Sequence, residues 1–266
     1  IRLISFENLK KNNLNNKKIN LLNVSFNQKK AFDKISNKSN EYIKKSFNIA
    51  LKILNQKITN EFINGPISKK FFLKKKYLGI TEYLAHQTKT KNYAMLIYNK
   101  DLSVCPLTTH LPLKKVSKKI NKNIIKKKIK LIDTFYKKNL GYKPKMAITG
   151  LNPHCESVDS FDEDKKIIKP TINSLNKLNY KISGPLPADT IFLRNNRKKY
   201  NVIIGMYHDQ VLTPLKTLFE YNAINITLGL PFIRVSPDHG PNEKMLGKNK
   251  SNPLSLIKSL KFLDIK

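Results

Sequence analysis

The hydrophobic and polar positions along the chain predict helices that alternate with strands. Apolar residues recur every three or four positions in stretches typical of amphipathic helices: residues 39–57, 116–136, 167–178 and 253–263. Short apolar runs bounded by polar and turn-forming residues predict buried strands: residues 58–63, 94–98, 102–104, 145–149 and 201–206. Such alternation is typical of an α/β fold with a mainly parallel or mixed sheet. The tract through residues 10–18, rich in Lys and Asn, predicts a weakly ordered start.

Histidines stand out in the loops that follow the predicted strands. Three of the five histidines, His110, His154 and His208, lie in such loops. Ligands bind at the carboxyl ends of strands in open α/β sheets, so we expect the three imidazoles at one edge of the sheet. Neutral imidazole is a common metal ligand, and three protein ligands with one open position suit a catalytic ion. The alternative left open by the spacing is three loop histidines that are each hydrogen-bonded separately.

Further candidates for chemistry are scattered charged residues. Residues 184–190, rich in Pro, predict a rigid turn that presents Asp189, and Lys216 follows a later predicted strand. A carboxylate and an ammonium near a metal can take and return the proton of a hydroxyl group, although both also suit a turn and a solvated surface. Arg234, one of only four arginines, ends an apolar stretch. Its guanidinium suits two-point binding of a carboxylate or phosphate, with a structural ion pair as the alternative.

The formal net charge of +33 raises the alternative of a nucleic-acid-binding protein. The charge is almost all Lys, spread over the whole chain, and scarce Arg argues against specific nucleic-acid recognition. A positive field of this kind attracts small anionic substrates. The two cysteines, Cys105 and Cys155, form no CxxC pair, and no apolar run approaches the roughly 18 residues of a membrane helix. We therefore expect a cytoplasmic protein with reduced cysteines and no membrane partner.

Glycine motifs of nucleotide binding are absent from the sequence. Neither GxGxxG nor GxxxxGK[ST] occurs, so the residues by themselves indicate no dinucleotide. Other short motifs, taken together and in order, resemble the 4-hydroxythreonine-4-phosphate dehydrogenase family over roughly residues 60–260. The stretches that carry the resemblance are residues 65–69, 79–82, 108–113, 150–154, 184–190, 206–210, 225–234 and 238–240.

The resemblance implies a fold similar to the isocitrate and isopropylmalate dehydrogenases. Two intertwined α/β lobes around a cleft would occupy residues 1–266 as a single dehydrogenase chain. The family pattern implies a homodimer whose metal ligands come from both chains. It also implies NAD or NADP as cofactor without the glycine fingerprint, because this fold binds the dinucleotide differently.

The resemblance also implies roles for individual residues. Metal ligands would be His110, His154 and His208, with zinc, cobalt or magnesium as the ion. Substrate would be bound by Thr81, Lys216, Asn225 and Arg234. Asp189 and Lys216 are the candidates for proton handling. The implied reaction oxidises the C3 hydroxyl of 4-phosphooxy-L-threonine, after which the β-keto acid loses carbon dioxide to give 3-amino-2-oxopropyl phosphate in pyridoxine biosynthesis.

The chain departs from the family pattern at four places. Ile80 stands where the family usually has His, and residues 155–159 replace a Gly-rich stretch. Pro241 and Asn242 replace a small Thr-Ala pair in a region associated with the cofactor. The family's N-terminal Pro-Gly-Glu-Pro-Ala-Gly-Ile-Gly segment is not found, so we expect the N-terminal part of the family fold to be missing.

Two other enzyme functions stay open at this stage. The chain could oxidise a related phosphorylated hydroxy acid such as phospho-threonate. It could also be a metal-dependent hydrolase or lyase that uses the same histidines without a nucleotide.

Overall fold

The computed structural model describes residues 1–264 except residues 12, 29, 75 and 160. A sheet of eight strands runs through the molecule in the order β3-β10-β9-β4-β5-β8-β6-β7. The strands are β3 (Glu61–Ile63), β4 (Ala94–Tyr98), β5 (Ser103–Pro106), β6 (Met146–Thr149), β7 (Ile182–Leu186), β8 (Val202–Gly205), β9 (Ile224–Leu228) and β10 (Ile233–Pro237). Strands β5, β8, β6 and β7 are parallel, whereas β9 is antiparallel to both of its neighbours. The predicted α/β fold with a mixed sheet is confirmed.

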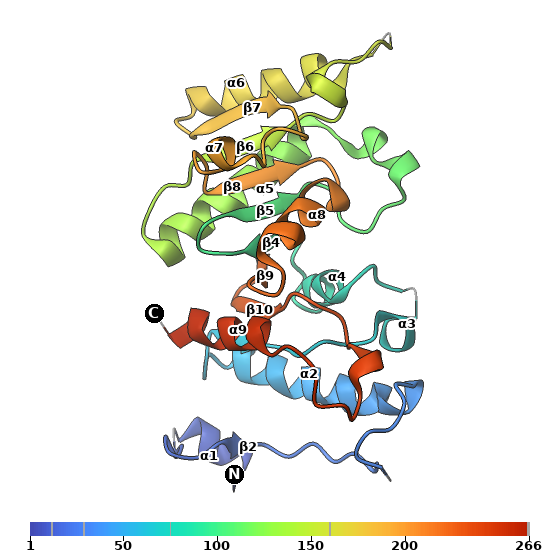
Figure 1. Cartoon of the computed structure of the whole chain (residues 1–266). Coiled ribbons are helices and arrows are strands. Elements are labelled where there is room, and N and C mark those ends of the chain that lie inside the picture. Colours follow the sequence, from blue (N-terminus) through green and yellow to red (C-terminus); the bar gives the residue numbers. More distant parts are fainter. Residues whose placement is uncertain (12, 29, 75, 160, 265–266) are drawn as a thin grey trace.

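Helices cover both faces of this sheet. The helices are α1 (Phe6–Lys10), α2 (Asn40–Asn55), α3 (Lys69–Phe72), α4 (Ile80–Gln87), α5 (Lys122–Phe135), α6 (Lys169–Lys177), α7 (Arg194–Arg197), α8 (His208–Phe219) and α9 (Leu254–Asp264). Figure 1 shows α5 and α8 on opposite faces of the central strands. Alternate residues of β4 face the two sides, since Leu96 packs with α5 and α6 while Met95 and Ile97 pack with α8.

Besides the clusters on the two faces of the sheet, a further hydrophobic cluster lies at the β3 end of the sheet. It joins α2, α3 and α4 through residues such as Phe47, Leu84 and Phe232. Beyond α2, the short parallel strands β1 (Arg2–Leu3) and β2 (Asn20–Leu21) form a separate two-stranded sheet with α1. Figure 1 places this N-terminal unit at the far end of the molecule from α6. How the chain divides into lobes stays a prediction.

Most predicted elements are confirmed, with shifted ends. The stretches predicted at residues 39–57, 94–98, 201–206 and 253–263 correspond to α2, β4, β8 and α9. The strand expected over residues 58–63 is shorter and forms only Glu61–Ile63. Within the polar tract of residues 10–18, residue 12 lies outside the described residues, and Lys10 ends α1. No helix among the described residues combines the length and hydrophobicity needed to cross a membrane.

The helix predicted from residue 116 begins six residues later. The Asn121 side chain accepts hydrogen bonds from the backbone N–H groups of Asn123 and Ile124, each at 3.0 Å. This N-cap satisfies two donors of the first turn and fixes the start of α5 at Lys122. The prediction was wrong here because apolar spacing continued through two short 3-10 turns before the cap.

Replacing Asn121 with Ala is therefore expected to destabilise the protein by about 1 kcal/mol, because the two capped N–H groups lose their acceptor. Urea denaturation followed by circular dichroism measures this change. Asn123→Ala is the matched control, because Asn123 contributes only its backbone N–H to the cap. Equal destabilisation by the two variants would show that the cap does not set the start of the helix.

A second difference concerns residues 184–190, where the sequence predicted only a turn. Gly184 to Leu186 continue β7, and the turn follows. Gly184 has φ +141°, and a Cβ there would lie 2.4 Å from the carbonyl oxygen of Ile148. Only glycine permits this close approach of β7 to β6, and the sequence pattern gave no sign of it.

Candidate active site

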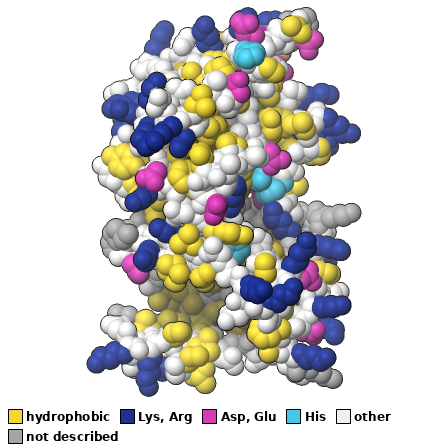
Figure 2. All heavy atoms as spheres, viewed as in Figure 1, with side chains coloured by type: hydrophobic (Ala, Val, Ile, Leu, Met, Phe, Trp, Pro, Cys, Tyr) yellow, Lys and Arg dark blue, Asp and Glu magenta, His cyan; other side chains and the backbone are white. Residues whose placement is uncertain are grey.

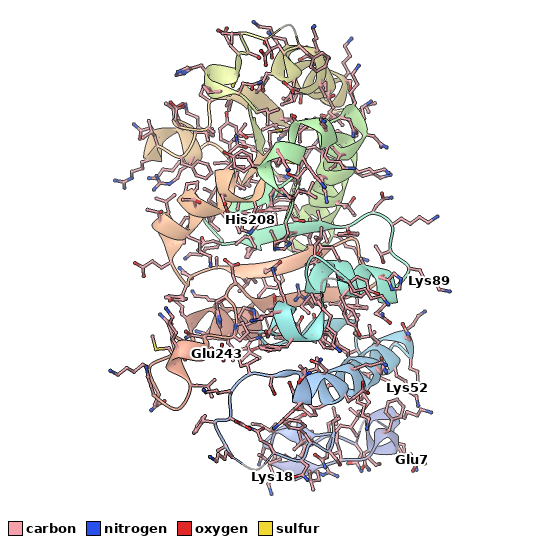
Figure 3. All side chains as sticks on the ribbon, turned by 90° about the vertical axis from the view of Figure 1, so that its right-hand side faces the viewer. Glu7, Lys18, Lys52, Lys89, His208 and Glu243 are labelled. Atoms are coloured by element: carbon pink, nitrogen blue, oxygen red, sulfur yellow. The ribbon has the colours of Figure 1, made fainter. Side chains whose placement is uncertain are left out.

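The sheet order brings the three histidine loops to one edge. Strands β5, β8 and β6 are adjacent and parallel, so the loops that carry His110, His208 and His154 all leave the same edge of the sheet. His208 is the first residue of α8 rather than a loop residue. Figure 3 shows it near the middle of the long axis of the molecule.

His110 and His208 lie side by side. Their ring centroids are 5.5 Å apart and their planes meet at 37°. His208 Nδ1 lies 2.7 Å from the Asp209 carboxylate, so this carboxylate orients the ring. Burial, together with the positive charge of Lys69, lowers the pKa of His110, which favours the neutral imidazole that binds metals.

The contacts of His110 indicate which ring nitrogen carries the lone pair. Lys69 Nζ lies 2.9 Å from His110 Nε2, and an ammonium can only donate, so Nε2 is the acceptor. His110 Nδ1 is buried and has no hydrogen-bond partner among the described residues. The Nε2 lone pair therefore faces a cationic position, which the Lys69 ammonium occupies in this structure.

His154 does not join this pair within one chain. It lies exposed in a single turn, Pro153–Cys155, and has φ 55° and ψ 14°. Among the described residues, no three His, Cys, Asp or Glu side chains come together as a group that could hold a metal. One chain thus brings together two of the three histidines expected as ligands.

Glu82 approaches the histidine pair from α4. Its Oε1 accepts a hydrogen bond from Thr109 at 3.2 Å, while its Oε2 is buried without a partner in the described part of the chain. A Cβ on Gly79 would lie 2.8 Å from Glu82 Oε2 and 3.3 Å from the ring of His110, so glycine lets α4 begin this close. Sequence reasoning missed Lys69 and Glu82, since both lay within family-like motifs but no pattern connected them to a histidine.

Arg234 is a buried cation close to Glu82. Its side chain is 2% exposed; Nε donates to Asn64 at 2.7 Å and Nη1 to Thr227 at 3.0 Å. Thr81 Oγ1 lies 3.3 Å from Thr227 Oγ1 and so joins this group, which we call the Arg234 cluster. Burial lowers the pKa of Arg234 to about 10, although Glu82 opposes the shift.

The alternative of a structural ion pair at Arg234 finds no support in the part of the chain that is described. No salt bridge there involves this guanidinium. A buried charge without an anion is costly to fold, which is typical of a site that binds an anionic ligand. Asn225, on β9, has a buried Oδ1 with no described hydrogen-bond partner and offers a further acceptor.

Lys216 and Asp189, expected to share the proton chemistry, have different described neighbours. Lys216 Nζ contacts the Asp238 carboxylate and the Asp238 carbonyl oxygen, each at 2.5 Å, which ties the loop after β10 to α8. Burial raises the pKa of Asp238, although Lys216 opposes the shift. Asp189 is exposed, and its charge acts on Cys155, the neighbour of His154. No described hydrogen bond or ion pair connects Asp189 with Lys216.

Gln210 joins the loop of His154 to the helix of His208. Its Nε2 donates to the Gly150 carbonyl at 2.8 Å, and its Oε1 accepts from Thr149 Oγ1 at 2.8 Å and from Met206 N at 2.7 Å. The ends of β6 and β8 are therefore held together by one side chain. Sequence reasoning quoted Gln210 only as part of a motif and assigned it no role.

Two clefts open beside these residues. One has a volume of about 380 Å³; Thr81, Glu82 and Thr109 line it together with four lysines, Lys91, Lys119, Lys127 and Lys128. The other, of about 480 Å³, lies between α2 and the end of β3 and reaches from Asn64 to Pro241. Both lie within the usual size range of ligand pockets.

The remaining positive charge has no comparable focus. Figure 2 shows Lys and Arg side chains over the whole visible face rather than gathered in one patch.

Ile80, where the resembled family has His, is 8% exposed and packs in the cluster of α2, α3 and α4. The side chain at this position is thus accommodated as part of a core.

The chain resembles known proteins over most of its length. Residues 1–263 match the family model described as "Pyridoxal phosphate biosynthetic protein PdxA". The chain is 42% identical over 217 residues to a 4-hydroxythreonine-4-phosphate dehydrogenase of Sulfurihydrogenibium sp. (strain YO3AOP1), which covers 80% of this chain and 67% of that protein. It is 37% identical over 187 residues to a D-threonate 4-phosphate dehydrogenase of Pectobacterium atrosepticum, covering 70% of this chain and 57% of the relative.

A solved structure shares the fold. A crystal structure of 4-hydroxythreonine-4-phosphate dehydrogenase from Klebsiella pneumoniae superposes with a TM-score of 0.73 at 31% identity, covering 86% of this chain and 71% of that one. The match to the two curated relatives named above spans 67% and 57% of their own length.

Proposed function

Since the chain belongs to the PdxA family of pyridoxal phosphate biosynthetic proteins, we propose that it oxidises the C3 hydroxyl of 4-phosphooxy-L-threonine with NAD or NADP. The hydroxyl proton leaves to a base and the C3 hydride leaves to the nicotinamide. The resulting β-keto acid loses carbon dioxide to give 3-amino-2-oxopropyl phosphate. Two observations carry the proposal: His110 and His208 are paired, and the buried Arg234, close to Glu82, has no ion-pair partner among the described residues.

The residues present fit a divalent metal. Two imidazoles converge at the strand ends, and the Nε2 lone pair of His110 already faces a cation, Lys69. Nitrogen donors favour zinc or cobalt over magnesium, which prefers oxygen ligands. A metal ion held there would polarise the substrate hydroxyl and stabilise negative charge on its oxygen.

We assign the third ligand, His154, to a second copy of the chain. His154 is exposed, and acidic residues follow it at Glu156 and Asp159 beside the fully exposed Val158. The 380 Å³ cleft next to His110 has four lysines on its walls, so its charge complements this loop. A symmetric dimer would place each loop in the other copy's cleft and build two sites.

The substrate's charged groups match the polar residues nearby. The planar guanidinium of Arg234, with Thr81, suits the phosphate or carboxylate. The unpartnered Oδ1 of Asn225 suits a donor such as the substrate ammonium. Lys216, held by Asp238, binds substrate as well.

Proton transfer is assigned to Lys216 of one copy and Asp189 of the other. Asp189 lies on the His154 side of the chain, as its effect on Cys155 indicates, so it enters the site with that histidine. The acid–base pair expected from the sequence is then completed between chains.

We place the cofactor in the 480 Å³ cleft. Aromatic residues such as Phe47 and Phe62 and hydroxyls such as Ser39 line it, which suits flat rings and sugar hydroxyls. Asn64, which lines the cleft, accepts a hydrogen bond from Arg234, so the cleft borders the Arg234 cluster. NAD or NADP bound there would accept the hydride.

Formation of reduced cofactor tests the proposal. We expect 4-phosphooxy-L-threonine to reduce NAD or NADP in the presence of zinc or cobalt, and the rate to collapse after chelation of the metal. D-threonate 4-phosphate is assayed beside it, because a relative carries that name. Turnover of that compound alone would assign the chain to the second substrate. Release of phosphate or another product with no cofactor reduction would favour a hydrolase or lyase instead.

A further inference from the structure

The turn that presents His154 has an unusual backbone. His154 and the next residue, Cys155, have φ 55° and φ 63°, so two consecutive non-glycine residues adopt the left-handed conformation. Such residues are uncommon and persist only where surrounding contacts determine them. The turn must therefore be held by its neighbours.

The contacts that hold it come mainly from Asp164. This carboxylate is 0% exposed. Its Oδ1 accepts from Leu151 N at 2.8 Å, and its Oδ2 accepts from Asn152 N at 3.0 Å and from Asn152 Nδ2 at 3.1 Å. One buried side chain thus fixes the two residues that lead into Pro153 and His154.

The neighbouring groups leave little room for another arrangement. A Cβ on Gly150 would lie 2.9 Å from Asp164 Oδ1 and 2.7 Å from Cys155 Sγ, so glycine permits the turn to close over the carboxylate. Cys155 N donates to the carbonyl of Asn152 at 3.1 Å. No salt bridge in the described part of the chain involves Asp164, and the hydrogen bonds described for its carboxylate come from amide donors.

We propose that Asp164 is a positioning residue that sets the direction in which His154 reaches the metal of the second copy. The inference rests on the proposed function, because it needs His154 to be a ligand. Asp164 touches neither substrate nor metal in this account. It acts by holding the backbone of residues 151–155 in the strained turn.

Asp164→Asn is the sharpest test, because it keeps the shape and removes one acceptor. Whichever way the amide turns, its NH2 group faces an N–H donor of Leu151 or Asn152, and at least one hydrogen bond is lost. Asp133→Asn is the matched control, since Asp133, on α5, is also a buried carboxylate but pairs with Lys137 rather than with the histidine loops.

Two measurements separate the hydrogen bonds of Asp164 from their effect on metal binding. Amide exchange of Leu151 and Asn152, followed by NMR in the metal-free protein, reports the hydrogen bonds themselves. Titration with Co²⁺, followed by its visible absorption, reports ligand geometry and affinity. We expect faster exchange in Asp164→Asn, a Co²⁺ affinity about 10- to 100-fold weaker and an altered spectrum. Asp133→Asn should match the wild type in both.

The other outcomes overturn the inference in distinguishable ways. Unchanged exchange would show that Asp164 does not hold the turn. Faster exchange with unchanged Co²⁺ affinity and spectrum would show that the turn does not position a ligand, and the proposed function would stand. A wild-type protein that binds no Co²⁺ would overturn the metal site of the proposed function, and the inference with it.

Discussion

His208→Ala is expected to lower kcat/KM about a thousandfold or more, because the substrate hydroxyl loses a metal-polarised site when one ligand of three is removed. The variant should also bind much less zinc or cobalt, which metal analysis after dialysis measures. The ring packs beside His110 at the surface end of α8, so the fold should persist.

His86→Ala is the matched control for this loss. His86 is also a histidine near a helix end, but it is exposed and its ring contacts Tyr77 rather than His110 or His208. Its activity and metal content should equal those of the wild type. Full activity in His208→Ala would remove His208 from the metal site, and equal losses in both variants would indicate damage to the fold.

Arg234→Lys is expected to lower kcat/KM for the phosphorylated substrate about 100-fold, largely through KM. A lysine ammonium cannot bond both Asn64 and Thr227 while it presents two parallel donors to an anion. The KM for the cofactor should change little, because we propose that the cofactor binds in the neighbouring cleft.

Steady-state kinetics with each ligand varied in turn measure this selectivity. Arg194→Lys, on the exposed helix α7, keeps the same chemical change away from the site and should leave both KM values unchanged. An unchanged KM for substrate in Arg234→Lys would mean that the buried guanidinium serves the fold rather than an anion.

The edge of the sheet that carries the histidines could be predicted from the sequence. Each of the three follows a short apolar run, and parallel strands place their carboxyl ends together. The pairing of His110 with His208, and the separate place of His154, could not be predicted, because they depend on strand order and on a left-handed turn. Neither leaves a trace in apolar spacing.

Helix α8 was not predicted from the sequence, for a different reason. Its apolar residues Val211, Leu212 and Leu215 have helical spacing, and Asp209 lies in the first turn. Pro214 in the middle of the helix and the preceding strand hid this signal, so His208 was expected in a loop. Asp209 close to the helix start was the feature that could have revealed the N-terminus.

The Arg234 cluster could be predicted only in part from the sequence. Scarcity of arginine drew attention to Arg234 itself, whereas its partners lie in separate parts of the chain: Asn64 directly follows β3, and Thr227 lies on β9. They meet only because β10 pairs with β3 on one side and with β9 on the other. Long-range strand pairing of this kind has no local sequence signal.

The shared metal site is the central claim, and mixing two inactive variants tests it most directly. His154→Ala and His208→Ala should each be inactive alone. After unfolding and refolding together, half of the random dimers are mixed and one of their two sites is intact, so about a quarter of wild-type activity should return. A mixture that stays inactive while dimers of both variants exchange, or a His154→Ala protein that is active alone, would contradict the claim.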